Sequence, residues 1–188
     1  MAISDGTLAS ALVRKIVALL PSAPPDVTLE TSTIERSVDD DAAVLFAWLN
    51  DDDEVPSLPA GAHAWEVDER VQWNDAPGAA GVKRVIFVHR LPSIDRDEFA
   101  EHWSNDHAPL ARKHHPALRR YVQNIVVSRL TNDAPDIDGI AELSFASVTD
   151  MRERMFDSEE GRSVIAADVD TFIDLAAGSR VVVAEGTP

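Results

Sequence analysis

The order of strand-like and helix-like segments in the second half of the chain is the feature that most limits its possible folds. Residues 82–91 form an apolar, β-branched run that ends before Pro92, and residues 120–130, 139–147 and 179–185 form further runs of strand length. Helical patterns lie between the first and second runs and between the third and fourth. This β-α-β-β-α-β order predicts a ferredoxin-like α+β unit, in which an antiparallel sheet carries both helices on one face.

Local sequence signals place the first helix directly after the first strand. Asp95 is followed three residues later by Glu98, which is the pattern of an N-cap with a capping-box partner. Phe99 and Trp103 lie four residues apart and therefore share one helix face. We expect this helix to begin near Arg96.

A proline in the same region predicts that the helix does not run on unchanged. Pro109 disfavours helical geometry in the residue before it, so a break or kink is expected near His107. His102 and His107 are five residues apart, which places them about 140° apart around a regular α-helix. On this geometry the two imidazoles do not share a face, and no metal site is predicted.

The sheet face opposite the helices must be covered, because a soluble protein does not leave a whole apolar sheet face in water. We expect residues 1–80 to be a degenerate, helix-poor copy of the ferredoxin-like domain in residues 81–188. The two share similar openings, Val-Arg-Lys-Ile-Val at residues 13–17 and Val-Lys-Arg-Val-Ile at residues 82–86. The sequence leaves open whether one chain completes the barrel or two chains are needed.

The first half contains further strand candidates at residues 33–38, 44–49 and 64–73. The gaps between them are short and rich in proline, so they leave no room for two full helices. An alternative interpretation is an N-terminal amphipathic helix, whose apolar stripe would consist of Leu8, Leu12, Ile16 and Leu19.

Composition narrows the classes of function. The 188 residues include 17 Lys and Arg against 33 Asp and Glu, for a formal net charge of −16, which disfavours nucleic-acid and anionic-membrane partners. The chain has no cysteine, which excludes disulfides, thiolate metal sites and cysteine nucleophiles. No basic leader and no apolar run of about 20 residues is present, so we expect a cytoplasmic protein.

Several motifs of the second half resemble those of the EthD family. They are Phe-Ala-Glu-His-Trp at residues 99–103, Asp-His-Ala-Pro-Leu at 106–110 and Leu-Arg-Arg-Tyr-Val-Gln-Asn at 118–124. Ala-Glu-Leu-Ser-Phe at residues 141–145, and Asp168 with Phe172, also fit the family pattern. The resemblance covers residues 82–186.

The resemblance implies a dimeric α+β barrel, in which two ferredoxin-like sheets pack face to face, and therefore a homodimer. Members of the family include a protein associated with ethyl tert-butyl ether degradation, dehydratases and cyclases of polyketide pathways, and a methylmuconolactone isomerase. These proteins work without a cofactor on small, largely apolar carbonyl or phenolic compounds.

His107 is the leading catalytic candidate, because a neutral imidazole can take a proton from a phenol or from a carbon next to a carbonyl group. The alternative is a histidine that closes the helix end by binding a backbone carbonyl. Tyr121 and Asn124 are candidate hydrogen-bond donors to a developing oxyanion. Because strand residues alternate between faces, at most one of these two side chains faces a cavity.

Three further residues are predicted to contact substrate. His89 ends the first strand of the domain, and Trp103 and Phe145 are candidates for the wall of an apolar pocket. The alternative for the two aromatic residues is a place in the ordinary hydrophobic core.

These features support one leading function and two alternatives. The first hypothesis is a cofactor-independent lyase or isomerase with His107 as its general base. The second is a non-catalytic protein that binds a small molecule or acts as an accessory protein, and the third is a haem-binding barrel.

Overall fold

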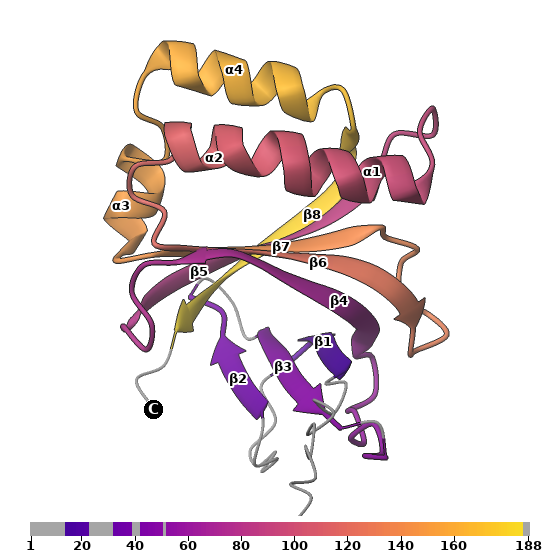
Figure 1. Cartoon of the computed structure of the whole chain (residues 1–188). Coiled ribbons are helices and arrows are strands. Elements are labelled where there is room, and N and C mark those ends of the chain that lie inside the picture. The colour runs from indigo at the N-terminus through magenta and orange to yellow at the C-terminus, as the bar shows by residue number, and fades with distance from the viewer. Residues whose placement is uncertain (1–13, 23–31, 39–41, 51, 186–188) are drawn as a thin grey trace, which may run out of the picture.

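A computed structural model describes residues 14–22, 32–38, 42–50 and 52–185. The strands are β1 Arg14–Leu20, β2 Ser32–Arg36, β3 Ala43–Leu49, β4 His63–Asn74, β5 Gly81–Arg90, β6 Arg120–Arg129, β7 Gly139–Phe145 and β8 Ile173–Glu185. The helical elements are α1 Arg96–His102, η1 Trp103–His107, α2 Ala108–His114, α3 Val148–Glu153 and α4 Glu159–Val169. Helices α1, α2 and α4 lie on one side of strands β4 to β8, and β1 to β3 lie on the other side of these strands (Figure 1).

The α+β class and the β-α-β-β-α-β element order of the second half are confirmed. Strands β5, β6 and β7 cover the predicted segments, and β8 begins at Ile173 rather than at residue 179. Helix α1 begins at Arg96 as predicted. The Asp95 side chain accepts the Glu98 N–H, and the Glu98 side chain accepts the Asp95 N–H, which completes the capping box.

All eight strands form one antiparallel sheet with the order β2-β3-β1-β4-β6-β7-β5-β8. The sheet curls until its two edges meet. Ser37 and Val183 form an antiparallel bridge, and the Val38 N–H donates to the Val182 carbonyl at 2.9 Å. The sheet face opposite the helices is thus covered by strands of the same chain, which answers the question that the sequence left open.

The alternative of an N-terminal helix is wrong for the residues that the structure describes. Ile16 and Leu19 lie on β1, which pairs with β3 along one side and with β4 along the other. Leu8 and Leu12 lie outside the described residues. Pairing on both sides satisfies the backbone groups of β1, and its side chains are buried on both faces.

The two largest hydrophobic cores of the described residues lie on opposite faces of the sheet, and two smaller clusters lie on strands of the first half. The helix-side core lies between the helices and the second half of the sheet, and it includes Phe99, Trp103, Tyr121 and Phe172. The lumen core fills the inside of the curled sheet with residues from both halves of the chain, namely Val17, Val44, Phe46, Trp65, Val67, Val85, Phe87, Val126, Ala134, Ile137, Ile140 and Val183. Side chains from residues 1–80 and 81–188 therefore meet in a common interior.

Candidate functional site

A π-helical turn shapes the helix that carries His107. Element η1 follows α1 without a break, and the Ala108 N–H donates to the carbonyl of Trp103, five residues earlier. The wider turn accommodates Pro109 at the start of α2, where no N–H is needed. The helix therefore does not break near His107, and the irregularity expected there takes the form of a π-helical turn through which the helix continues.

The same turn brings His102 and His107 onto one carboxylate. His107 Nδ1 lies 2.7 Å from Asp168 Oδ2, and His102 Nε2 lies 2.9 Å from Asp168 Oδ1. The prediction that the two imidazoles do not share a face is thus wrong, since it assumed a regular α-helix. Asp168, from α4, holds both rings.

His107 is set up as a proton acceptor. Its side chain is 8% exposed, and burial lowers its pKa, while the hydrogen bond and charge of Asp168 oppose this shift only in part. Because a carboxylate accepts hydrogen bonds, Nδ1 carries the proton and Nε2 presents its lone pair. No other hydrogen bond reaches this ring from the part of the chain that the structure describes.

Tyr121 lies beside His107, with its ring centroid 6.4 Å from that of the imidazole. Its oxygen accepts hydrogen bonds from Trp103 Nε1 at 2.8 Å and from Gln123 Nε2 at 3.3 Å. Burial raises the pKa of the phenol, so it stays protonated. With both acceptor positions used, the O–H proton has no acceptor among the described residues and is available as a donor. We call His102, His107, Tyr121 and Asp168 the histidine cluster.

A surface pocket of about 280 Å³ lies close to the histidine cluster. Its lining residues are Gln72, Trp73, Ser104, Ala108, Pro109 and Arg112. The buried amide of Gln123 links the pocket to Tyr121, because Gln123 Oε1 accepts from Gln72 and Ser104 while Nε2 donates to the Tyr121 oxygen. Trp73 packs against the Tyr121 ring at 5.1 Å between centroids.

The six predicted site residues do not converge on one place. His107, Tyr121 and Trp103 lie together on the helix side of the sheet, and Phe145 belongs to the same core. Asn124 lies on the lumen side, where Nδ2 donates to Glu142 Oε1 at 3.0 Å. His89 lines a cavity at one end of the lumen. As the alternation predicts, Tyr121 and Asn124 face opposite sides of the sheet.

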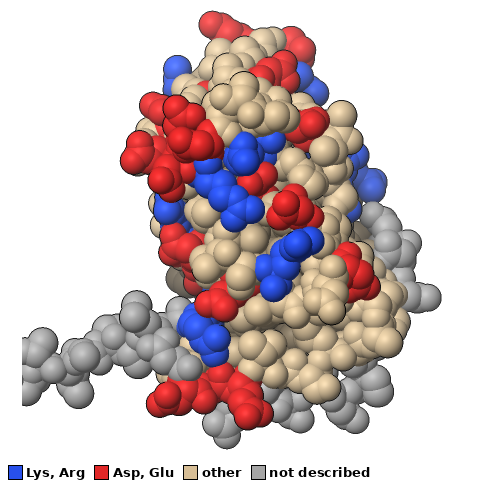
Figure 2. Space-filling view, turned by 90° about the vertical axis from the view of Figure 1, so that its right-hand side faces the viewer, with Lys and Arg blue, Asp and Glu red and all other residues tan. Residues whose placement is uncertain are grey.

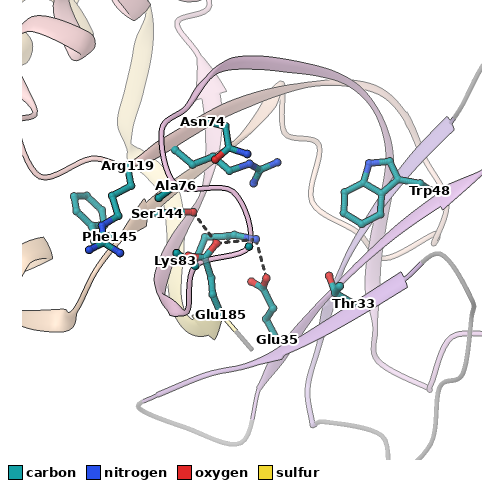
Figure 3. Close-up of a pocket in the computed structure, with 13 residues that line it drawn as sticks. Thr33, Glu35, Trp48, Asn74, Ala76, Lys83, Arg119, Ser144, Phe145 and Glu185 are labelled. Carbon is teal, nitrogen blue, oxygen red and sulfur yellow. Dashed lines mark hydrogen bonds and ion pairs between the residues drawn. The ribbon is translucent and has the colours of Figure 1, made fainter. Parts of the chain in front are cut away.

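The lumen contains a second polar group of residues, at the end that is open to a cavity of about 220 Å³ (Figure 3). Lys15 Nζ lies 2.6 Å from Glu69 and 2.5 Å from Glu142, and Lys83 Nζ lies 2.9 Å from Glu35 and 3.2 Å from Glu142. We call this group the lumen cluster, and its members are Lys15, Glu35, Glu69, Lys83, Arg120, Glu142 and Glu185.

The lumen cluster is held together by charge. Burial opposes ionisation of Glu142, but Lys15, Lys83 and Arg120 outweigh it and hold the pKa of this carboxyl well below its usual range. Burial likewise disfavours charged Lys83, and the carboxylates of Glu142, Glu35 and Glu185 outweigh it and raise its pKa. Each charged group of the cluster has an opposite charge within 4 Å, which is the arrangement of a structural network.

Sequence reasoning did not identify the lumen cluster or the role of Asp168. Asp168 appears in the sequence only as part of the family pattern, because nothing local connects it to a histidine 61 residues earlier. Lys15 and Glu142 lie 127 positions apart, on strands that become neighbours in space only when the sheet curls. The sequence signal for the lumen cluster was Glu142, a charged residue in the middle of the mainly apolar strand β7.

Basic and acidic side chains are interleaved on the face shown in Figure 2, without a continuous basic area. Within the described ranges, no helix is long and apolar enough to cross a lipid bilayer. The same residues contain no group of three or more His, Cys, Asp or Glu arranged to hold a metal ion.

Comparison with known proteins supports this fold. A solved structure described as an anthrone oxidase-like protein is 13% identical and superposes with a TM-score of 0.62, covering 92% of this chain and 90% of that one. A structure described as a major regulator of staphylococcal pathogenesis is 10% identical, with a TM-score of 0.53 and coverage of 90% and 97%. At these identities the likeness concerns the fold alone.

Sequence comparison is more specific for the second half. No curated protein matches the chain. Residues 91–176 match the family model of the EthD domain, and this range includes the whole histidine cluster. This match confirms the resemblance to the EthD family that the motifs of the second half indicate.

Proposed function

We propose that this protein is a cofactor-independent lyase or isomerase, of the dehydratase or cyclase type, with His107 as its general base. Its substrate would be a small apolar carbonyl or phenolic compound of polyketide, aromatic or ether degradation chemistry. The observation that carries the proposal is the 2.7 Å contact between Asp168 and His107 Nδ1, which leaves Nε2 as the basic atom.

The proposed chemistry is a proton transfer. His107 Nε2 takes a proton from a carbon next to a carbonyl group, and the electron pair of the broken C–H bond moves onto the carbonyl oxygen as an enolate. Tyr121 stabilises this oxyanion by donating its O–H. The imidazolium, which Asp168 stabilises, then returns the proton to another carbon or to a leaving oxygen.

We propose that the substrate reaches His107 and Tyr121 through the surface pocket beside Trp73. The Gln123 amide bonds both to Gln72 in the pocket and to the Tyr121 oxygen, and its rotation would help to open a path. For an apolar compound to lie against His107, the rings of Phe99, Trp103 and Phe172, which pack at 5.2 Å and 5.9 Å between centroids, would have to move apart. Trp103 is the predicted substrate contact that this placement retains.

Deuterium exchange tests the proposal even though the natural substrate is not identified. We expect the protein in D2O to catalyse incorporation of deuterium next to the carbonyl of 2-tetralone, an apolar ketone, followed by NMR. The His107→Gln variant should lose this catalysis by about 100-fold or more, as general bases usually contribute. His114→Gln is a matched control, because His114 is similarly buried and bonded to Asp157 but lies outside the cluster. Equal exchange in the wild type and His107→Gln would contradict the proposal.

A non-catalytic small-molecule binding protein is the second candidate. Close packing around His107, where Phe99, Trp103 and Phe172 are each 1% exposed, limits the room for a reacting substrate and so favours binding without turnover. This alternative predicts that 2-tetralone or a related compound raises the unfolding temperature without any deuterium exchange.

We also propose that residues 1–80 are a degenerate copy of the domain in residues 81–188. The strand order β4-β1-β3-β2 in the first half corresponds to β8-β5-β7-β6 in the second, and both are the ferredoxin-like order. In this interpretation the first half occupies the place of a second subunit. A homodimer, which the resemblance implies, would then form through another surface.

A further inference from the structure

The side chains that line the lumen of the curled sheet differ in polarity between its two ends. Inward-facing positions of β5 are Lys83, Val85, Phe87 and His89, and those of β4 are His63, Trp65, Val67 and Glu69. Each strand therefore passes from a charged residue, through apolar residues, to a histidine. The histidine end is away from the lumen cluster and on the opposite sheet face from His107.

A cavity of about 330 Å³ occupies this end. Its lining residues are Leu19, His63, Trp65, Phe87, His89, Pro135, Ile137, Ala177 and Ser179. The walls are mainly apolar and aromatic, with a few polar groups, which is the usual make-up of a small-molecule site. Since an apolar cavity of about 150 Å³ accepts benzene, this one has room for about two fused rings.

The walls of the cavity are fixed before any ligand arrives. Trp65 Nε1 donates to the Pro135 carbonyl at 3.0 Å, and the Trp65 and Phe87 rings pack at 5.3 Å between centroids. The Asp138 N–H donates to the Val88 carbonyl at 2.9 Å and ties the loop of Pro135 to β5. A preformed site binds without a large ordering cost.

The rim is irregular where the cavity opens. Phe87 pairs with Ser179 but His89 pairs with Asp174, so one residue of β5 faces four unpaired residues of β8. Such bulges occur at barrel rims and beside sites, where they end regular pairing. The small residues Ala177 and Ser179 leave the cavity open at this point.

Two imidazoles supply the polar groups. The imidazole of His89 makes no hydrogen bond to the described part of the chain. Among the same residues, the one charged partner of His63 is Asp133, with 3.8 Å between Nε2 and Oδ2. An imidazole offers a ring N–H donor and a lone-pair acceptor. A hydroxyl group on an aromatic ligand can therefore exchange a hydrogen bond with His89 while its rings contact Trp65 and Phe87.

We infer that this cavity is a binding site for a small hydroxylated aromatic compound of about two rings, separate from the histidine cluster. The inference does not rest on the proposed catalytic function. It uses different residues, on the other face of the sheet, and it would hold for a protein with no activity.

The test uses 2-naphthol as the probe, titrated into the whole protein by isothermal calorimetry. We expect wild type to bind it and His89→Phe, which keeps an aromatic ring, to bind about fivefold to tenfold more weakly, as the loss of one hydrogen bond predicts. Ser179→Phe places a ring in the cavity and should abolish binding. Ser179 is exposed, so this variant should remain folded, which its thermal unfolding checks.

His107→Gln distinguishes the cavity from the histidine cluster, and it should bind 2-naphthol like the wild type. Failure of the wild type to bind the probe would overturn the inference. So would loss of binding in His107→Gln together with full binding in Ser179→Phe, because the probe would then occupy the helix side of the sheet.

Discussion

The protein contains two buried polar groups of residues on opposite faces of one sheet, and they differ in how completely they are paired. In the lumen cluster each charge has an opposite charge within 4 Å. In the histidine cluster, Asp168 satisfies one nitrogen of His107, and both the other nitrogen and the Tyr121 proton are left without a described partner. Glu35 Oε2 of the lumen cluster accepts no hydrogen bond from the described residues, so the contrast lies in the pairing of charges. Opposite charges on every member indicate a structural network, whereas a basic nitrogen beside a hydroxyl proton is a candidate site of chemistry.

The largest effect is expected from removal of the central charge of the lumen cluster. Glu142→Gln leaves Lys15 and Lys83 with less compensation in a site that is 1% exposed, and it should lower the free energy of unfolding by about 3–5 kcal/mol. Urea denaturation measures this change. Glu66→Gln is the control, because its ion pair with Arg14 spans 3.8 Å at a more exposed position, and it should cost less than about 1 kcal/mol.

The pH dependence of this effect follows from the lowered pKa of Glu142. A carboxyl group with a lower pKa in the folded state contributes stability above its unfolded pKa and loses it as the pH falls. The difference between wild type and Glu142→Gln should therefore be full at pH 7 and should shrink below about pH 4. A difference that does not change with pH would show that the carboxylate charge is unimportant.

The next effect is expected on the histidine cluster, through the positioning residue Asp168. Asp168→Asn removes the charge that selects the Nδ1–H form of His107, and deuterium exchange into 2-tetralone should fall by about 100-fold. The pH below which protonation of His107 inhibits the remaining activity should also be lower in the variant than in the wild type. The reason is that Asp168 raises the pKa of His107 against the effect of burial. An unchanged pH profile would mean that Asp168 only fills space.

The smallest effect is expected from the Tyr121 hydroxyl group. Tyr121→Phe removes one neutral hydrogen bond to the developing oxyanion and should reduce exchange by about tenfold. It also deprives Trp103 Nε1 of its acceptor, so unfolding is measured in parallel. A variant that exchanges deuterium as fast as the wild type would remove Tyr121 from the proposed chemistry.

Local sequence signals predicted the elements of the second half well, because caps and periodicity act within a few residues. The capping box of Asp95 and Glu98 and the strand that carries Tyr121 are examples. The relation of His102 to His107 was missed for a specific reason. A proline predicts that a regular helix cannot continue, but it does not predict that the chain will adopt a π-helical turn instead.

The sequence by itself determined the α+β class, the order of elements in residues 81–188 and the EthD motifs, since each depends on residues close together in the chain. Only the tertiary structure decided that β1 to β3 cover the open face, that Asp168 reaches His107, and that Lys15 meets Glu142. These contacts join residues at least 61 positions apart. The strand contacts exist because one continuous sheet curls until its edge strands meet, and the contact of Asp168 with His107 exists because α4 packs beside η1. No local pattern contains that curvature.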